Sequence, residues 1–271
     1  MTLLSSCTLA GVAWRAAFST LGCAGVPLDD VARTAVDGGW DGLELRAAPG
    51  EPVHVGLTSA ERAGVRRLLT DANLAALAIA SYVEVDDAGA TDEEVVESTL
   101  AHVELAGDLG ASFVRVFPGG PSDDSAAVRR LTEIASRLDD HPGVAVALET
   151  HDSCASGRDV ARVLAHVDHP QVRAVWDVQH PWRAGERVAD TLRALVPFIG
   201  YVQITEACSI DDPTPCLLGT GVVPLREAYD ELVRAGYDGW VSLEWASYWY
   251  PDAPPLAHAL DGARRWLSGT L

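Results

Sequence analysis

Val144-Ala-Val-Ala-Leu-Glu149 is a short apolar segment with the pattern of a buried β-strand, and it ends on a carboxylate. Three later segments have the same form and end on an oxygen donor: Val172-Arg-Ala-Val-Trp-Asp177, Ile199-Gly-Tyr-Val-Gln203 and Trp240-Val-Ser-Leu-Glu244. A charge at the end of a buried strand is costly unless it is paired or binds a metal ion. The carboxyl ends of the strands of a β/α barrel meet at one mouth. The four segments therefore predict a site for a hard divalent cation at a barrel mouth.

Short apolar runs alternate with amphipathic helical stretches about eight times, which is typical of a parallel sheet built from βαβ units. We expect strands near residues 16–20, 42–46, 75–82, 112–117, 144–149, 172–177, 199–204 and 240–245. No linker divides them, so the sequence predicts a single-domain α/β fold, a (β/α)8 TIM barrel over residues 1–271. An open doubly wound sheet is the alternative, but residues 18–25 lack its G-x-G-x-x-G nucleotide loop.

The predicted helices have recognisable ends. Thr58 with Glu61, and Thr91 with Glu94, have the spacing of capping boxes that open helices. The helix that begins after Thr91 is expected to stop at Gly110, because glycine readily adopts the left-handed conformation that ends many helices.

The chain has 39 acidic and 20 basic residues, which give a formal net charge of −19. This charge argues against nucleic acid as a partner, because phosphate backbones are bound by clustered Lys and Arg. All the basic residues are arginine, which excludes enzymes that form a Schiff base through lysine. The five cysteines are scattered without a C-x-x-C motif, and no stretch is long enough to span a membrane. We therefore expect a cytoplasmic protein with reduced thiols and no contact with membranes.

Three motifs carry a resemblance to a known family. They are Gly39-Trp-Asp-Gly-Leu-Glu-Leu-Arg46, Ala106-Gly-Asp-Leu-Gly-Ala-Ser-Phe-Val-Arg-Val116, and Leu218-Gly-Thr-Gly-Val-Val-Pro224 leading to Gly236-Tyr-Asp-Gly-Trp-Val-Ser-Leu-Glu244. The chain resembles the sugar phosphate isomerase/epimerase family of xylose isomerase-like TIM barrels. That resemblance implies a divalent ion, often Mn²⁺ or Mg²⁺, held by Glu, Asp, His and Glu from the last four strands.

The resemblance implies a role for each residue that matches the family pattern. Glu149 matches the first metal ligand, Asp177 the second and Glu244 the fourth. Gln203 stands where relatives usually have His, and its amide oxygen can still coordinate a hard cation. Family members that dehydrate cyclic hydroxy-ketones are similar in using Gln here. Oxygen donors favour Mn²⁺ or Mg²⁺, with Co²⁺ and Zn²⁺ as alternatives.

The chemistry that we expect is proton abstraction next to a carbonyl group. A metal chelated by the substrate's carbonyl and hydroxyl oxygens lowers the pKa of the adjacent C–H. Glu149 or Glu244 removes the proton, giving a metal-stabilised enediolate, and the other returns it as an epimer or isomer. Loss of a β-hydroxyl from the same intermediate gives a dehydrated product. His180 matches a family histidine that touches substrate hydroxyls, so it is the expected substrate hydrogen bond or leaving-group acid.

Four more residues are expected to contact substrate or orient a ligand. Glu44 matches a glutamate at the rim of related barrels, and His151 shares the strand-end orientation of Glu149. Glu206 replaces an Asp of the family after strand 199–204. Trp249 belongs to an aromatic loop that follows the last strand and forms either a wall over the substrate or a contact with a partner subunit.

Trp245 adds to this apolar mouth, and arginines are the expected anion contacts. Arg46, Arg115 and Arg183 lie in or next to predicted loops, whereas residues 205–216 contain no basic side chain where barrels commonly bind phosphate. We therefore expect an unphosphorylated small-molecule substrate. The opposing interpretation of the strand-end carboxylates is a buried ionic network with arginines such as Arg115, Arg173 and Arg183.

Three functions remain open on the sequence. The first is a metal-dependent isomerase or epimerase that acts on a polyhydroxylated carbonyl compound. The second is a lyase similar to 3-dehydroshikimate dehydratases, acting on a cyclic hydroxy-ketone or a natural-product intermediate. The third is a barrel that has lost catalysis and serves as a binding protein, and each of the three allows a homo-oligomer.

Overall fold

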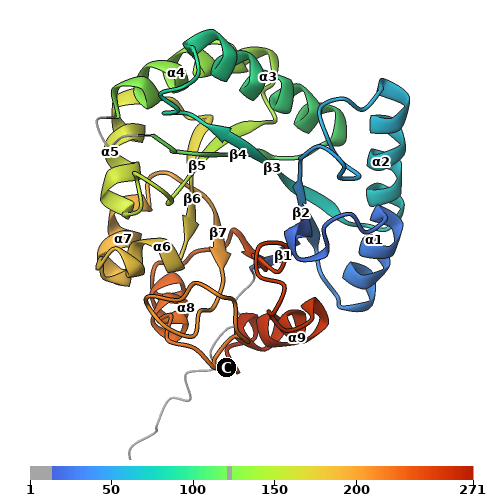
Figure 1. Ribbon diagram of the computed structural model, residues 1–271, viewed down its shortest axis with the longest axis vertical. Coiled ribbons are helices and arrows are strands. Elements are labelled where there is room, and N and C mark those ends of the chain that lie inside the picture. The colour runs from blue at the N-terminus through green and yellow to red at the C-terminus, as the bar shows by residue number, and fades with distance from the viewer. Residues whose placement is uncertain (1–13, 121–123, 271) are drawn as a thin grey trace, which may run out of the picture.

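The computed structural model describes residues 14–120 and 124–270, and their strands form a closed parallel barrel in the order β1 to β8 (Figure 1). Each strand pairs with its neighbours in the sequence, and β1 pairs with β8 to close the barrel. The strands are β1 Arg15–Ser19, β2 Gly42–Arg46, β3 Ala75–Glu84, β4 Phe113–Phe117, β5 Ala145–Glu149, β6 Val172–Asp177, β7 Ile199–Ile204 and β8 Trp240–Leu243. The predicted TIM barrel is thus confirmed, with strand limits that differ by one or two residues.

The helices lie outside the barrel and cover the sheet (Figure 1). They are α1 Leu28–Asp37, α2 Ser59–Asp71, α3 Asp92–Leu109, α4 Ser125–Ala135, α5 Gly157–Val167, α6 Gln179–Arg183, α7 Val188–Leu195, α8 Leu225–Arg234 and α9 Leu256–Leu267, with 3₁₀ turns at Thr20–Cys23 and Leu138–Asp140. Both predicted capping boxes are present, at Thr58 and Thr91. Gly110 ends α3 in the left-handed conformation at φ 76°, as expected.

Side chains alternate between the two faces of the last four strands and so contribute to two separate apolar layers. In β5, Val146 and Leu148 pack in the large core between sheet and helices, whereas Ala147 packs in a smaller cluster with Val175 and Tyr201. Side chains two residues apart share a face of a strand. The inner face of each strand is therefore apolar in the interior of the barrel and changes to a polar side chain at its carboxyl end. This alternation aims the strand-end side chains into the mouth.

The cysteines of the described residues are unpaired, as expected: Cys23, Cys154, Cys208 and Cys216. Cys7 lies outside the described residues. Within residues 14–120 and 124–270, no helix is both long and apolar enough to cross a membrane.

The capping box of α3 provides a test of local stability. The Thr91 hydroxyl accepts a hydrogen bond from the Glu94 N–H at 3.2 Å, and Glu94 accepts one from the Thr91 N–H at 2.8 Å. Loss of this cap in Thr91→Ala should lower the free energy of unfolding by about 1 kcal/mol, measured by urea denaturation. Thr132→Ala is the control, because its exposed hydroxyl bonds only a carbonyl within α4. Equal stability of the two variants would contradict the assignment.

Candidate active site

Four oxygen-bearing side chains meet at the mouth of the barrel. Glu149 and Asp177 are the last residues of β5 and β6. Gln203 is the penultimate residue of β7, and Glu244 follows β8 directly. Carboxylate oxygens of Glu149, Asp177 and Glu244 lie within 4.8 Å of one another, close enough to share one ion. Glu149, Asp177 and Gln203 are at most 1% exposed, whereas Glu244 is partly open to the cavity. The convergence predicted from the strand ends is therefore present in the structure.

Two buried oxygens of this group lack a hydrogen-bond partner among the described residues: Asp177 Oδ2 and Gln203 Oε1. The other oxygen of Asp177 is satisfied, because it accepts from the Gln179 N–H at 2.7 Å. Leaving a buried acceptor unpaired typically costs about 1–3 kcal/mol, so such atoms are rare in native proteins. A divalent cation would satisfy both oxygens at once, and a donor set of carboxylate and amide oxygens suits a hard ion. The residues present thus fit the metal that the sequence suggests.

Glu44 fixes the orientation of the Gln203 amide. The Glu44 carboxylate is fully buried and accepts hydrogen bonds from Tyr201 Oη and Gln203 Nε2, both at 2.9 Å, and from Ser242 Oγ at 2.8 Å. The Gln203 amide thus turns its NH₂ group toward Glu44, a carboxyl whose pKa is raised by burial. The Gln203 oxygen is then the amide atom without a hydrogen-bond partner among the described residues. A neutral amide gains in this way the fixed orientation that a metal ligand requires.

Burial and crowding raise the pKa values of two of these carboxyl groups. Burial first, and then the charge of Glu149, raise the pKa of Asp177 to about 7. Burial together with Glu149 and Asp177 also raises the pKa of Glu244 well above its ordinary value. The opposing charge comes from Arg115, whose guanidinium lies 2.9 Å from Glu149 Oε2. One cation among several carboxylates leaves an excess of negative charge, which a divalent ion would neutralise.

The alternative interpretation was a buried ionic network between the strand-end carboxylates and arginines. The structure contains one such pair, while the other two arginines have different partners. Arg115 and Glu149 form a buried ion pair. Arg173 instead donates to the Ile199 carbonyl at 3.0 Å, and Arg183 donates to the Ile210 carbonyl at 3.0 Å. Asp177 Oδ2 and Gln203 Oε1 therefore remain without an arginine partner.

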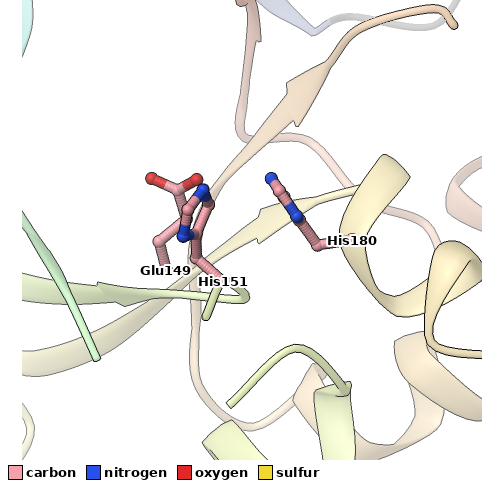
Figure 2. A group of neighbouring side chains, drawn as sticks. All are labelled: Glu149, His151 and His180. Carbon is pink, nitrogen blue, oxygen red and sulfur yellow. The ribbon is translucent and has the colours of Figure 1, made fainter. Parts of the chain in front are cut away.

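A pair of histidines lies beside Glu149. Figure 2 shows Glu149 and His151 at the end of β5, with His180 of α6 pointing toward them. The two imidazole centroids are 4.2 Å apart, and one nitrogen of each ring lies within 4.8 Å of a Glu149 oxygen, so these three residues form a second group able to hold a metal ion. Burial and the charges of His151 and Arg183 lower the pKa of His180 to about 3. His180 is therefore neutral at pH 7 and can accept or donate a hydrogen bond.

A cavity of about 390 Å³ opens above these groups. Glu149, His151, His180 and Glu244 line it, together with three other residues that we expected at the mouth: Arg115, Arg183 and Trp249. Aromatic side chains form much of its wall, and the Arg115 guanidinium lies 3.9 Å from the centroid of the Phe117 ring.

Three predicted substrate contacts do not line this cavity. Glu44 lies below it and is occupied by Tyr201, Gln203 and Ser242. Glu206 is 2% exposed and accepts backbone hydrogen bonds from the loop that follows β7, so it organises that loop. Trp245 is fully buried and donates its indole N–H to the Pro254 carbonyl at 3.1 Å. The structure therefore places these three side chains away from the cavity, because a position near a strand end does not decide whether a side chain turns toward the cavity or into the protein.

Sequence reasoning missed two aromatic residues of the cavity wall, Tyr82 and Phe117. Both lie in the carboxyl-terminal parts of their strands, β3 and β4. The rule that identified the carboxylates could have found them, because it applies to every strand of the barrel. We applied it only to strands ending on metal-binding side chains.

The family can be assigned at this point. A sequence model described as xylose isomerase-like TIM barrel matches residues 32–268. The chain belongs to this family.

Relatives within this family include enzymes with different reactions. The chain is 26% identical over 244 residues to a 3-dehydroshikimate dehydratase of Bacillus anthracis, across 81% of this chain and 86% of that protein. It is 23% identical over 257 residues to a fructoselysine 3-epimerase of Escherichia coli O157:H7, across 88% of this chain and 92% of that protein. A crystal structure of the IolI protein with a zinc atom has the same fold, with a TM-score of 0.77 at 17% identity, covering 95% of this chain and 99% of that one.

The orientation of Gln203 can be tested through Glu44. Glu44→Gln introduces an NH₂ group that can donate to Gln203 Oε1, so the amide loses its fixed orientation. We expect affinity for Mn²⁺, measured by titration calorimetry, to fall about 10–100-fold, as for other residues that orient metal ligands. Tyr201→Phe is the matched control, because it also removes a hydrogen bond to Glu44 but leaves the Glu44–Gln203 contact in place. The idea fails if the two variants bind Mn²⁺ equally well.

The crowded carboxylates also predict the pH dependence of the metal-free protein. The pKa of Asp177 is about 7 in the folded state, and an unfolded Asp has a pKa of about 3.9, so the folded state binds more protons between these values. Stability should therefore fall as pH rises from 5 to 8, by on the order of 3 kcal/mol. Urea denaturation of chelator-treated protein measures this fall. Asp177→Asn should flatten the profile, and a rise in stability with pH would contradict the assignment.

Proposed function

We propose that this protein is a divalent-metal-dependent isomerase or epimerase that removes a proton next to a carbonyl of a small, unphosphorylated, polyhydroxylated compound. The observation that carries the proposal is the pair of unpartnered buried oxygens, Asp177 Oδ2 and Gln203 Oε1, beside carboxylates that face a cavity. Glu149, Asp177, Gln203 and Glu244 would hold the ion. Their oxygen donors favour Mn²⁺ or Mg²⁺, and Co²⁺ or Zn²⁺ are alternatives. Such an ion, when bound, polarises a carbonyl and acidifies the neighbouring C–H.

Glu149 and Glu244 are the proposed acid and base. Both line the cavity, and they come from different sides of the mouth, on β5 and after β8. Arg115 holds the Glu149 carboxylate in place through a buried ion pair. One glutamate removes the proton from the carbon next to the carbonyl, and the other returns a proton to the opposite face or to the neighbouring carbon. The first outcome is an epimer and the second an isomer.

His180 is proposed to bind a substrate hydroxyl. Its ring lines the cavity and is kept neutral by the low pKa that burial imposes. A neutral imidazole can donate one hydrogen bond and accept another, so it can bind a substrate hydroxyl in either sense. Nε2 lies 3.8 Å from Asp177 Oδ2, which places His180 next to the proposed metal ligands.

The basic residues near the cavity support an unphosphorylated substrate. Arg115 is paired with Glu149, and Arg46 is paired with Glu51 below the surface. Arg183 lines the cavity and is the remaining anion contact among those that we named. Phosphate held by Arg46 or Arg183 in a crystal would overturn this part of the proposal.

Dehydration is the second candidate, and Gln203 favours it. The relative that matches at 26% identity is named a 3-dehydroshikimate dehydratase, and the family resemblance noted from the sequence associates Gln at position 203 with dehydration. Removal of the proton by one glutamate would be followed by loss of a β-hydroxyl, which would leave as water with a proton from the other glutamate, while neutral His180 donates a hydrogen bond to the leaving oxygen. The product would gain a conjugated chromophore. The third interpretation, an inactive binding barrel, fits poorly with cavity-facing carboxylates that are all retained.

The remaining predictions concern the type of substrate, the location in the cell and the assembly of the protein. A small-molecule substrate agrees with the enzymes among its relatives. Location in the cytoplasm and assembly into a homo-oligomer stay predictions from the sequence.

Glutamate variants test the reaction. The protein is loaded with Mn²⁺ and incubated in D₂O with a panel of hydroxypyruvate, ketohexoses and 3-dehydroshikimate, and NMR follows deuterium at the carbon next to the carbonyl. We expect exchange to fall about 10²–10⁴-fold in Glu149→Gln and in Glu244→Gln, because each loses an acid or base. Glu227→Gln, on the exposed face of α8, is the control.

The two candidate reactions differ in their products. An isomer or epimer keeps the absorbance of the substrate, whereas a dehydrated product absorbs in the ultraviolet. Protein that takes up none of the four divalent ions would contradict both.

A further inference from the structure

A second hollow lies beside the mouth and is larger than the cavity above the carboxylates. It has a volume of about 810 Å³ and runs between the loop that follows β2 and helix α3. Helices α2 and α3 are neighbours on this side of the barrel, next to β2 and β3 (Figure 1). We call this hollow the α3 groove. Its walls are largely apolar, with contributions from Ala47, Pro49, Val55, Val83 and Val95.

The α3 groove adjoins the proposed active site at two aromatic residues. Tyr82 and Trp249 line both hollows. Their rings meet edge to face, with centroids 6.5 Å apart and an interplanar angle of 75°. Trp249 is 56% exposed, which is unusual for so large an apolar side chain in the absence of a ligand or partner. A molecule that passes between the cavity and the groove would cover both rings.

The charges around the α3 groove select against an anion. Glu84, Asp87 and Glu94 lie along it. Arg46 also lines it, but its guanidinium is paired with Glu51 and lies 4.1 Å from the centroid of the Tyr248 ring. The groove therefore offers apolar area and negative charge. It suits a neutral or cationic apolar group and disfavours a carboxylate or phosphate.

We infer that the substrate has two parts, a polar hydroxy-carbonyl head that binds at the carboxylates and an uncharged apolar arm that crosses Tyr82 and Trp249 into the α3 groove. This inference rests on the proposed function, because the head must reach the metal ligands. The cavity of about 390 Å³ holds the head, and the groove of about 810 Å³ gives the arm twice that space. The substrate class is then a conjugated natural-product intermediate, larger than a free sugar.

Hydroxamic acids separate the two parts of the inference. A hydroxamate chelates a divalent ion through two oxygens, as a hydroxy-carbonyl head would, and it can carry an arm of any length. Acetohydroxamic acid is the head alone. Phenylalkanohydroxamic acids of increasing chain length add an apolar arm, and a carboxyalkanohydroxamic acid adds an anionic one. Titration calorimetry on the Mn²⁺-loaded full chain measures each affinity.

The α3 groove predicts a gain in hydroxamate affinity that depends on whether the arm is apolar or anionic. At the best chain length, a phenyl arm should tighten binding at least about tenfold over acetohydroxamic acid, because it buries an aromatic ring. The carboxylate-ended arm should give no gain. Val55→Asp places a charge in the groove wall and should abolish the phenyl gain while the affinity of acetohydroxamic acid stays unchanged. Val222→Asp is the matched control, since Val222 is exposed to a similar extent, 48% against 40% for Val55.

The outcomes distinguish this inference from the proposed function. If no hydroxamate binds, the metal site itself is wrong. If acetohydroxamic acid binds and no phenyl arm adds affinity at any length, the metal site stands and the arm is refuted. Sedimentation velocity supplies a second check: a dimer that Val55→Asp converts to monomer would show that the groove is covered by a second copy of the chain, which also refutes the arm.

Discussion

Negative charge crowded into a buried mouth is the constraint on which this structure depends. Glu149 and Asp177 are buried, Glu244 opens to the cavity, and the guanidinium of Arg115 pairs with Glu149. Burial, and after it the charge of the neighbouring carboxylates, raises the pKa of Asp177 and of Glu244. A folded chain tolerates such a group when a bound cation completes it, and that need links the fold to the proposed chemistry.

Gln203 contributes an oxygen to the barrel mouth without adding negative charge. A fourth carboxylate ligand would add to the repulsion, whereas Gln203 supplies an oxygen without a charge. An amide has a donor and an acceptor end, so it needs a partner that fixes its orientation. Glu44 supplies that partner from β2, far away in the sequence, with Tyr201 and Ser242 completing its hydrogen bonds. The neutral ligand and the buried glutamate below it therefore work as one unit.

The strands and the convergence of the strand-end oxygens could be predicted because both follow from local pattern. Alternation along a strand and convergence of strand ends place Glu149, Asp177 and Gln203 correctly. The same reasoning predicted that Glu206 and Trp245 contact substrate, but neither side chain lines the cavity. Both lie at or beyond the ends of their strands, where the alternation stops and loop packing decides the direction of a side chain. Tyr82 was missed for the opposite reason, since it obeys the strand rule but carries no metal-binding group.

The sequence by itself determined the barrel, the donor oxygens and the exclusion of lysine chemistry and nucleic acid. These depend on composition, on alternation and on the order of strands, all of which are local properties. The tertiary structure decided which oxygens stay without a partner, how the Gln203 amide is oriented, and where the α3 groove meets the cavity. Each of these requires side chains from distant strands and loops to be placed within a few ångströms of one another. Pairing of that kind depends on packing, which the order of residues along one strand does not contain.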